Sequence, residues 1–595
     1  MTTLAARPSD LAIVNRAEFT PNSMSDMANS SLSSADFVGQ YGDILANIYQ
    51  SRGIHCLSDL ATGAKDLLHF NQLDGIAAAV DLLAQCIIQQ RRVVIIGDFD
   101  ADGATSTALC MLSLRDLGLN NVNYLVPNRF DFGYGLSPEI VDVAIAQFNP
   151  DVLLTVDNGI ACHAGVNHAK AQGLQVIITD HHLPAETLPD ADAIVNPNQA
   201  HCEFGSKHLA GVGVAFYVLS ALKTHLVQQQ WFSDTRPAPN LAQYLDIVAL
   251  GTVADVVKLD KNNRIFVYQG LQRIRSGQCR PGIRALLDVA GKPVDKINAT
   301  DLGFILGPRL NAAGRLEDMA QGIECLLADD YETARGMAHT LDSLNRQRRE
   351  IETEMRESAE QTLASLQLDQ DALPDGLVLF DPDFHQGVIG IVAGRIKEQY
   401  YRPTIVFALQ DEEELKGSAR SLPGVHIRDV LDEINTRFPH IINKFGGHAM
   451  AAGLSIAPEQ LSAFTQAFND VLARHMAQIP KEAQVLSDGQ LSSHHLSLDF
   501  AHTLNQSGPW GQGFDEPIFD NVFTLVSQRI VGEKHLKMVL QLAHLSIDAI
   551  AFNVDTAEWP NQHVEQVHVA YKLNINEFRG QQTVQCMVVK FGPAR

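Results

Sequence analysis

Short clusters of aspartate and histidine residues stand at the ends of apolar runs in this chain. They read GDFDADG (97–103), TVDNG (155–159), TDHH (179–182) and VADVV (253–257). Their side chains comprise six carboxylates and two imidazoles: Asp98, Asp100, Asp102, Asp157, Asp180, His181, His182 and Asp255. So many carboxylates share a small volume only when cations neutralise them. Hard oxygen ligands suit Mg²⁺ or Mn²⁺, so the clusters predict a metal centre with two divalent cations.

The first three clusters directly follow runs that predict buried strands, Val93–Ile96, Val152–Leu154 and Val176–Ile178. Segments with helical spacing separate these runs, and this alternation of strand and helix predicts an α/β fold whose parallel sheet carries helices on both faces. Because the carboxyl ends of parallel strands lie along one edge of a sheet, we expect the clusters to converge on one crevice.

Each cluster also has a simpler interpretation when it is taken alone. The segment 98–103 could be a solvated turn, Asp157 a turn former, and His181 and His182 a structural pair. A calcium loop would need Glu at its twelfth position, where the chain has Leu109. Asp255 lies in an apolar stretch where an unpaired carboxylate would be costly, which favours a ligand role. Two metal ions activate water for attack on phosphorus, so the set predicts hydrolysis of a phosphoester or phosphoanhydride.

At 595 residues the chain is too long for one hydrophobic core. We expect a flexible leader (1–40), a catalytic α/β domain with N-terminal helices (41–321), a solvated connector helix (322–370), a smaller α/β domain (371–483) and a β-rich barrel or sandwich (484–595).

The net charge of −24 opposes phosphate binding, although part of the acidic excess belongs to the proposed metal centre. The eight cysteines form no C-x-x-C pair, which argues against a zinc knuckle or a disulfide frame. No apolar run approaches the roughly 20 residues that span a bilayer, and the N-terminus has no apolar signal core. The expected location is the cytoplasm, without membrane contact.

Longer motifs carry a resemblance to a known family. Besides Asp180-His181-His182 they read VPNRFDFGYGLSPE (126–139), LAGVGVAFY (209–217), GPRLNAAGRLEDM (307–319), GSARSLPGVHIRD (417–429), FGGHAMAAG (445–453) and GPWGQGFDEPIF (508–519). With these motifs the chain resembles the DHH phosphoesterase superfamily and, within it, the RecJ family of bacterial exonucleases.

The resemblance implies a DHH domain, a connector helix, a DHH-associated domain and an OB-type barrel around a central channel. It implies hydrolysis of single-stranded DNA from the 5′ end to mononucleotides, in DNA repair and recombination. Single-stranded DNA, single-strand-binding protein and a RecQ-type helicase are the implied partners, and a monomer is expected.

The resemblance also implies roles for single residues. Asp100 and Asp157 would hold one ion, and Asp102, Asp157, His181 and Asp255 the other. Asp98, Asp180 and His182 would act in catalysis beside the ions. The expected substrate contacts are Arg129, Arg309 and Arg315 along the strand, and Ser418, Arg420 and His448 at the 5′ phosphate. Each arginine could instead form a structural ion pair.

Four positions depart from the family pattern. Phe384 stands where the family usually has Trp, Gln386 and Asp515 where it has Pro, and Ala419 where it has Gly. Ala419 puts the backbone approach to phosphate in question.

In the barrel, basic Arg529, Lys534 and Lys537 occur beside Trp510, Phe519 and Phe523, a combination typical of single-strand binding, although these aromatics could be barrel core. Two rival functions are a DHH phosphodiesterase for short oligonucleotides or cyclic dinucleotides, which usually lacks the barrel, and a non-catalytic scaffold, which would have lost metal ligands.

Overall fold

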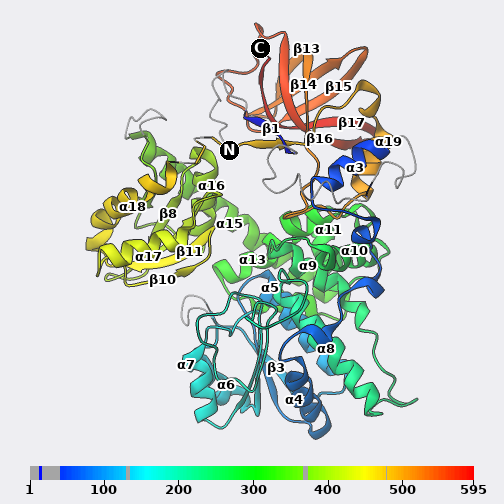
Figure 1. The fold of residues 1–595 in the computed structure, drawn as a ribbon, viewed down its shortest axis with the longest axis vertical. Coiled ribbons are helices and arrows are strands. Elements are labelled where there is room, and N and C mark those ends of the chain that lie inside the picture. Colours follow the sequence, from blue (N-terminus) through cyan, green and yellow to red (C-terminus); the bar gives the residue numbers. More distant parts are fainter. Residues whose placement is uncertain are drawn as a thin grey trace.

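The protein, seen here as a computed structural model, is described over residues 12–16, 32, 41–128, 135–365, 373–477, 479–480 and 482–594. In Figure 1 a first α/β body (blue to green) lies at the bottom, a second α/β unit (yellow-green) at the left and a barrel (orange to red) at the top. Within these residues no helix combines the length and apolarity needed to cross a membrane.

The lower body is built on a parallel sheet with the order β3-β2-β4-β5-β6. Its strands are β2 (Val93–Ile96), β3 (Val122–Leu125), β4 (Val152–Val156), β5 (Gln175–Thr179) and β6 (Ala193–Val195). Val93 pairs with Val152 and Val152 with Gln175, so β2, β4 and β5 run in register. Their carboxyl ends therefore lie along one edge.

Both faces of this sheet are covered, as predicted. Val93 and Ile95 of β2 join the core formed with α4 (Ile76–Gln89), α5 (Ala101–Asp116) and α8 (Gly211–Gln228). Val94 and Ile96 join the opposite core, formed with α6 (Pro138–Phe148) and α7 (His163–Ala171). Alternate residues of a strand point to opposite faces, and both sets are buried here, which explains why the strands read as continuous apolar runs.

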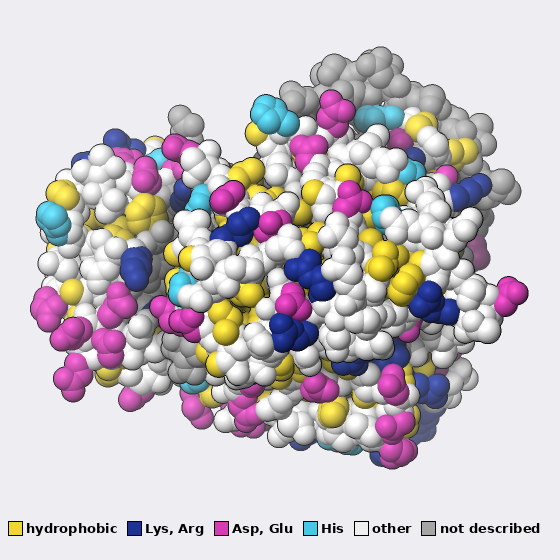
Figure 2. Space-filling model, turned by 90° about the horizontal axis from the view of Figure 1, so that it is seen from below, with side chains coloured by type: hydrophobic (Ala, Val, Ile, Leu, Met, Phe, Trp, Pro, Cys, Tyr) yellow, Lys and Arg dark blue, Asp and Glu magenta, His cyan; other side chains and the backbone are white. Residues whose placement is uncertain are grey.

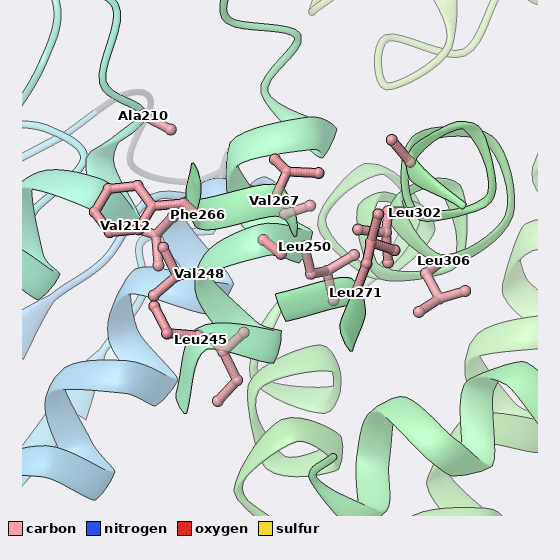
Figure 3. Close-up of a cluster of buried hydrophobic side chains, with 14 of the residues drawn as sticks. Ala210, Val212, Leu245, Val248, Leu250, Phe266, Val267, Leu271, Leu302 and Leu306 are labelled. Atoms are coloured by element: carbon pink, nitrogen blue, oxygen red, sulfur yellow. The ribbon is translucent and has the colours of Figure 1, made fainter. Parts of the chain in front are cut away.

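A helical layer packs beside the sheet and carries the fourth acidic cluster. It contains α9 (Leu245–Ala254), α10 (Lys261–Arg275), α11 (Pro281–Val289), the π-helical turn η7 (Leu302–Leu306) and α13 (Gly307–Leu316). Figure 3 shows apolar side chains from α9, α10 and η7 meeting in one cluster. Each fully buried leucine there contributes about 1.5–3 kcal/mol, so the end of α9 is firmly held.

The predicted connector differs from the observed one in two respects. A single helix over 322–370 was expected, but α14 (Ala320–Leu327) ends before α15 (Tyr331–Ser365) begins. The carboxylate of Asp330 accepts a hydrogen bond from the backbone N–H of Thr333 and starts the new helix. The expectation of a largely solvated helix is also wrong, because α15 buries apolar side chains in two cores: Ala334, Ala338, Leu341, Leu344, Met355, Ala359 and Leu363.

The second α/β unit has the strand order β10-β11-β9-β8-β7. Only β7 and β8 are parallel; the other neighbours are antiparallel. The strands are β7 (Leu377–Phe380), β8 (Thr404–Leu409), β9 (Leu415–Arg420), β10 (Lys444–Gly447) and β11 (Ala451–Ile456). The helices are α16 (Ile389–Tyr400), α17 (Ile427–Arg437) and α18 (Leu461–Met476).

The C-terminal unit is a closed barrel with the order β13-β14-β15-β17-β16, which confirms a barrel rather than a sandwich. Its strands are β13 (Phe519–Val531), β14 (His535–Leu542), β15 (Leu545–Ala551), β16 (Gln566–Phe578) and β17 (Gln581–Pro593). Closure leaves no free sheet edge among these strands.

The N-terminal part of the chain is attached beneath this barrel. Most of the leader expected over 1–40 lies outside the described residues, but β1 (Ile13–Asn15) within it pairs in parallel with β12 (Val485–Ser487). Tyr49, in α3 (Gly42–Gln50), stacks on Trp510 and Phe514 of the segment that leads into the barrel.

Charge is unevenly distributed over the surface. In Figure 2, which views the molecule from below, several Lys and Arg side chains lie over the middle of the face among Asp and Glu side chains, while Asp and Glu crowd the left-hand lobe.

Candidate metal centre

The first acidic cluster forms the turn from β2 into α5. The carboxylate of Asp100 caps α5 by accepting hydrogen bonds from the backbone N–H groups of Asp102 and Gly103, at 2.9 and 3.0 Å. Asp102 in turn accepts hydrogen bonds from the N–H groups of Gly211 and Val212, at 2.6 and 3.0 Å. Its carboxylate is therefore fixed by the start of α8, a segment 109 residues away in the chain.

Asp157 directly follows β4 and adopts a left-handed backbone conformation, with φ of 62°. This conformation is uncommon for residues other than glycine, and residues that adopt it cluster at functional sites. The close approach of α8 requires glycine at position 211, where a Cβ would lie 2.7 Å from the Asp157 side chain.

His181 is the point at which the predicted ligands converge. Its Nε2 lies 3.1 Å from Oδ1 of Asp157, 3.4 Å from Oδ2 of Asp255 and 4.0 Å from Oδ2 of Asp102. A neighbouring group is formed by Asp98, Asp100 and Asp157, whose potential ligand atoms all lie within 4.8 Å of one another. Asp157 belongs to both groups.

The protonation chemistry of these residues fits a cation site. Burial, followed by repulsion from neighbouring carboxylates, raises the pKa of Asp102 to about 7 and holds the pKa values of Asp157 and Asp255 well above their usual range. Burial lowers the pKa of His181 to about 4, so the ring is neutral and offers a lone pair. Nε2 of His181 and Oδ2 of Asp255 are buried and make no hydrogen bond within the described part of the chain.

Asp180 and His182 form a hydrogen-bonded pair beside these ligands. Asp180 accepts from the N–H of Ile160 at 2.9 Å and from the N–H of His181 at 2.7 Å, and it lies 2.7 Å from Nδ1 of His182. Burial opposes a cationic ring, but the hydrogen bond and charge of Asp180 outweigh it and raise the pKa of His182 to about 9. His182 is thus placed to carry a proton at neutral pH.

Residues of the second α/β unit reach this centre. The ring of His448 stacks on the ring of His182, with centroids 6.1 Å apart. Ser418 and Arg420 project from the same face of β9, and a guanidinium N–H of Arg420 donates to Oγ of Ser418 at 3.0 Å. They face Gly390 in the first turn of α16, where a Cβ would lie 2.7 Å from the guanidinium. A helix N-terminus, an arginine and a hydroxyl together form a site for an anion.

Two of the expected substrate arginines have different surroundings. Arg315 donates to the carbonyl of Gly387 at 3.1 Å and so joins the two α/β units. Arg309 is buried, and its guanidinium pairs with Asp342 of α15 at 2.8 Å, which favours the structural alternative for this residue. Arg129 lies outside the described residues.

The barrel aromatics are not available for stacking on bases. Trp510, Phe519 and Phe523 are 9%, 0% and 1% exposed, so the expectation that they form a binding platform is wrong. Phe519 and Phe523 are barrel core, as the alternative had it, whereas Trp510 is buried against Tyr49 at the junction before the barrel. Sequence alternation within β13 places Phe519 and Phe523 on the inward face of a closed barrel.

The departures at Ala419, Gln386 and Asp515 have defined contacts in the structure. Ala419 alternates with Ser418 and Arg420 along β9 and points into the core, away from the anion site. The side chain of Gln386 donates to the carbonyl of Leu409, and Asp515 pairs with Arg16.

Three asparagine side chains that the sequence patterns did not indicate form hydrogen bonds with the backbone of the metal centre. Asn311 accepts from the N–H of Ala101, Asn196 donates to the carbonyl of His182, and Asn198 donates to the carbonyl of His181. The only available signal was the Asn-Pro-Asn sequence that follows a strand.

The parallel sheet, the Asp-His-His segment at its edge and the facing second unit define a DHH-type phosphoesterase. The model of the DHH family N-terminal domain matches residues 92–252, that of the DHHA1 domain 374–474 and that of the RecJ OB domain 487–590. The chain belongs to the RecJ family of single-stranded-DNA-specific exonucleases.

Among its relatives, the single-stranded-DNA-specific exonuclease RecJ of Escherichia coli is 50% identical over 562 residues, which cover 94% of this chain and 97% of that protein. The crystal structure of RecJ from Thermus thermophilus in complex with Mn²⁺ has a TM-score of 0.75 at 28% identity and covers 98% of this chain and 79% of that one. The same protein in complex with Mg²⁺ has a TM-score of 0.70 at 27% identity, covering 98% of this chain and 78% of that one.

Proposed function

We propose that the chain hydrolyses single-stranded DNA stepwise from the 5′ end and releases mononucleotides, using two divalent cations, Mn²⁺ or Mg²⁺. The observation that carries this proposal is the convergence of Asp102, Asp157 and Asp255 on Nε2 of His181. Membership of the RecJ family and the metal-bound relatives support it.

In this proposal Asp100 and Asp157 hold one cation, and Asp102, Asp157, His181 and Asp255 hold the other. Bound cations of this kind lower the pKa of a water molecule and offset the charge on the phosphoryl oxygens. The buried acids supply the negative charge that attracts the ions, and the hydrogen bonds from Gly211 and Val212 keep Asp102 in place as they bind.

In this proposal His182 contacts the substrate directly, and Asp180 supports it. Protonated His182 donates a hydrogen bond to a phosphoryl oxygen, and Asp180 orients the ring through Nδ1. Asp98 completes the acidic wall beside Asp100. His182 also lies within a group of potential ligands with Asp157 and His181, which supports its proposed role as a proton donor.

The anion site supports the proposed 5′→3′ polarity of the reaction. Ser418, Arg420 and His448 bind the terminal 5′ phosphate, and the stacking of His448 on His182 keeps that site next to the metal centre. A strand held by its 5′ phosphate therefore presents one of its first phosphodiester bonds to the metal centre. Arg315 lies between the two units along the same path.

The direct test follows the degradation of single strands labelled at either end, with Mn²⁺. We expect mononucleotides to be released from the 5′ end first. Arg420→Gln should reduce the preference for a 5′-phosphorylated over a 5′-hydroxyl strand, whereas Arg437→Gln, which removes a surface ion pair with Glu433 of the same unit, should not. Degradation from the 3′ end, or none, would refute the proposal.

The rival function, cleavage of short oligonucleotides or cyclic dinucleotides, has no structural observation in its favour. Removing the barrel is a poor test, because Tyr49 of the N-terminal helix and Arg264 of the DHH body pack on Phe514 of the segment that precedes it. Comparing kcat/KM for a long strand and a dinucleotide with the intact chain separates the two functions. A higher value for the dinucleotide would favour the rival.

The proposal places this activity in DNA repair and recombination, with single-strand-binding protein and a RecQ-type helicase as partners of a monomeric enzyme. Sedimentation of the chain alone measures whether it is a monomer, and sedimentation with each partner measures whether the two proteins associate.

A further inference from the structure

We propose that the turn at residues 511–514, which leads into the barrel, positions Asp255 of the metal centre through the segment 256–259. This entry turn and the metal centre belong to different units of the fold. The inference rests on the assignment of Asp255 as a metal ligand in the proposed function. It makes the C-terminal part of the chain a structural support of one cation site.

The segment between Asp255 and the entry turn is short and held in an uncommon conformation. Asp255 is the C-cap of α9, and α10 begins at Lys261. Between them Val256 has a φ of 60°, in the left-handed region that β-branched residues rarely adopt. Such a conformation persists only where the surrounding structure holds it. Because α9 is anchored in the cluster of Figure 3, the other constraint must act at the far end of the segment.

The entry turn holds that far end through the backbone of Leu259. The N–H of Leu259 donates to the carbonyl of Gln512 at 2.8 Å. The turn itself is closed by two hydrogen bonds, from the N–H of Gly511 to the carbonyl of Phe514 at 2.9 Å and from the N–H of Phe514 to the carbonyl of Gly511 at 3.0 Å. The acceptor on Gln512 is therefore fixed in place.

Close packing at the same point limits how far Leu259 can move. A Cβ on Gly511 would lie 2.6 Å from Cδ1 of Leu259, whose side chain is buried. A Cβ on Gly513 would lie 2.6 Å from Cγ of Lys258. Both approaches are to side chains of the segment 256–259, so the entry turn fits this segment closely and glycine is required at 511.

Arg264 of α10 completes the contact between the two units. Its Nη1 donates to the carbonyl of Leu259 at 2.9 Å, and its Nη2 donates to the carbonyl of Asp59 at 2.7 Å. The guanidinium lies over the ring of Phe514, 4.4 Å from the centroid. Leu259 is therefore held at its N–H by the entry turn and at its carbonyl by an arginine that rests on that turn.

Asp255 is the member of the metal centre that a movement of Leu259 would reach. Its Oδ2 lies 3.4 Å from Nε2 of His181, within the group proposed to hold one cation. Asp98 and Asp100 of the other group are carried by the turn that follows β2. Because residues that support metal ligands typically change metal affinity by about 10–100-fold, loosening the entry turn should weaken one cation site selectively.

The test uses two variants that disturb Leu259 in different ways. Gly511→Ala pushes on its side chain, and Arg264→Lys keeps the charge but removes the guanidinium that binds its carbonyl. Free Mn²⁺ is measured by electron paramagnetic resonance during titration of each chain, without DNA. We expect the weaker of the two Mn²⁺ sites in each variant to have lost about 10–100-fold in affinity and the other site to be unchanged.

Matched controls separate positioning from a general loss of stability. In Gly376→Ala the new methyl group would overlap Leu472 within the second α/β unit. Arg275→Lys removes a guanidinium that donates from the same helix, α10, to the carbonyl of Ile297 at 2.8 Å. Both controls should lower the melting temperature and leave both Mn²⁺ affinities unchanged. Equal weakening in the controls, or unchanged affinities in both test variants, would overturn the inference.

A double variant tests whether the effect passes through Asp255. In an Asp255→Asn chain, Gly511→Ala should cause no further loss of Mn²⁺ affinity, because the ligand that the entry turn positions is already gone. A further loss of the same size as in the unaltered chain would overturn the inference. The titration needs no cleavage, so a selective loss of affinity that requires Asp255, in a chain that does not degrade DNA, would overturn only the proposed function.

Discussion

At the scale of single residues, the candidate metal centre is built from carboxylates that are buried close together. Burial and mutual repulsion make the ionised form of these groups unfavourable. Asp102, Asp157 and Asp255 are held close to one another with few charges to compensate them. Such repulsion is a cost to the fold that bound cations remove, so ligand binding and stability are linked at these residues.

Replacing Asp157 tests this link. Asp157→Asn should lower kcat at least about 100-fold, because the proposed shared ligand is lost, yet raise the melting temperature in EDTA, because a neutral amide relieves the repulsion. Asp142→Asn, which changes an exposed carboxylate that pairs with His168, should alter neither. Full activity of the Asp157 variant would remove this residue from the metal centre.

The raised pKa of Asp102 predicts an effect of pH on the metal-free protein. Between the ordinary pKa of 3.8 and the folded value of about 7, the folded chain binds this proton more tightly than the unfolded chain does. The contribution of Asp102 to stability is therefore present below pH 4 and is lost as pH rises through 7.

The lowered pKa of His181 makes the folded chain more stable as pH rises from about 4 to 6.5, which opposes the effect of Asp102. The measurement must therefore isolate the contribution of Asp102. The difference in melting temperature between Asp102→Asn and the unaltered chain in EDTA should move in favour of the variant from about pH 5 to pH 8. Saturating Mn²⁺ should abolish the advantage. A difference in melting temperature that does not change with pH would contradict the raised pKa of Asp102.

At the scale of elements, α13 braces the loop between β2 and α5. Asn311 of α13 accepts a hydrogen bond from Ala101, and a Cβ on Gly314 would overlap the carbonyl oxygen of Phe99. The helix therefore touches the backbone that carries Asp98 and Asp100. Glycine at 314 is required by this close approach.

Gly314→Ala should displace that loop, destabilise the fold by about 1–3 kcal/mol and reduce kcat, because small displacements of catalytic groups are costly. Gly336→Ala is a matched control in α15, with open space around the new methyl group. It should stabilise the helix by up to about 1 kcal/mol and leave kcat unchanged. Unaltered kcat in the Gly314 variant would show that the loop tolerates the shift.

At the scale of the whole molecule, a buried ion pair joins the N-terminal helix to the segment that enters the barrel. Nη1 and Nη2 of Arg52 donate to the two carboxylate oxygens of Asp488, at 2.7 and 2.9 Å, and the side chains are 1% and 2% exposed. Arg52 also donates to the carbonyl of Asp515 and lies over the ring of Trp510. The position of the barrel relative to the DHH body depends on this junction.

Arg52→Met should therefore destabilise the chain by about 3–5 kcal/mol, since Asp488 would remain buried with less compensation. Denaturant unfolding followed by tryptophan fluorescence measures this, because Trp510 lies at the junction. Arg437→Met, at an exposed pair, should cause little change. A small loss in the Arg52 variant would show that the packing of Tyr49 on Trp510 and Phe514 holds the junction without the ion pair.

The sequence by itself determined the parallel sheet with two covered faces and the presence of a β-rich C-terminal unit. Apolar runs and turn residues act over short distances and are therefore visible in the order of the residues. It also indicated that the acidic clusters would meet, because each of the first three directly follows a strand and parallel strands share an edge.

Only the tertiary structure decided which side chains act together. Arg309 is buried against a helix whose contacts no local pattern predicts, and Phe519 and Phe523 point inward only because the barrel closes. The stacking of His448 on His182, the break before α15 and the hydrogen bond from Leu259 to Gln512 likewise depend on packing between segments far apart in the chain. Such contacts are fixed by the free energy of the whole fold, which local propensities do not contain.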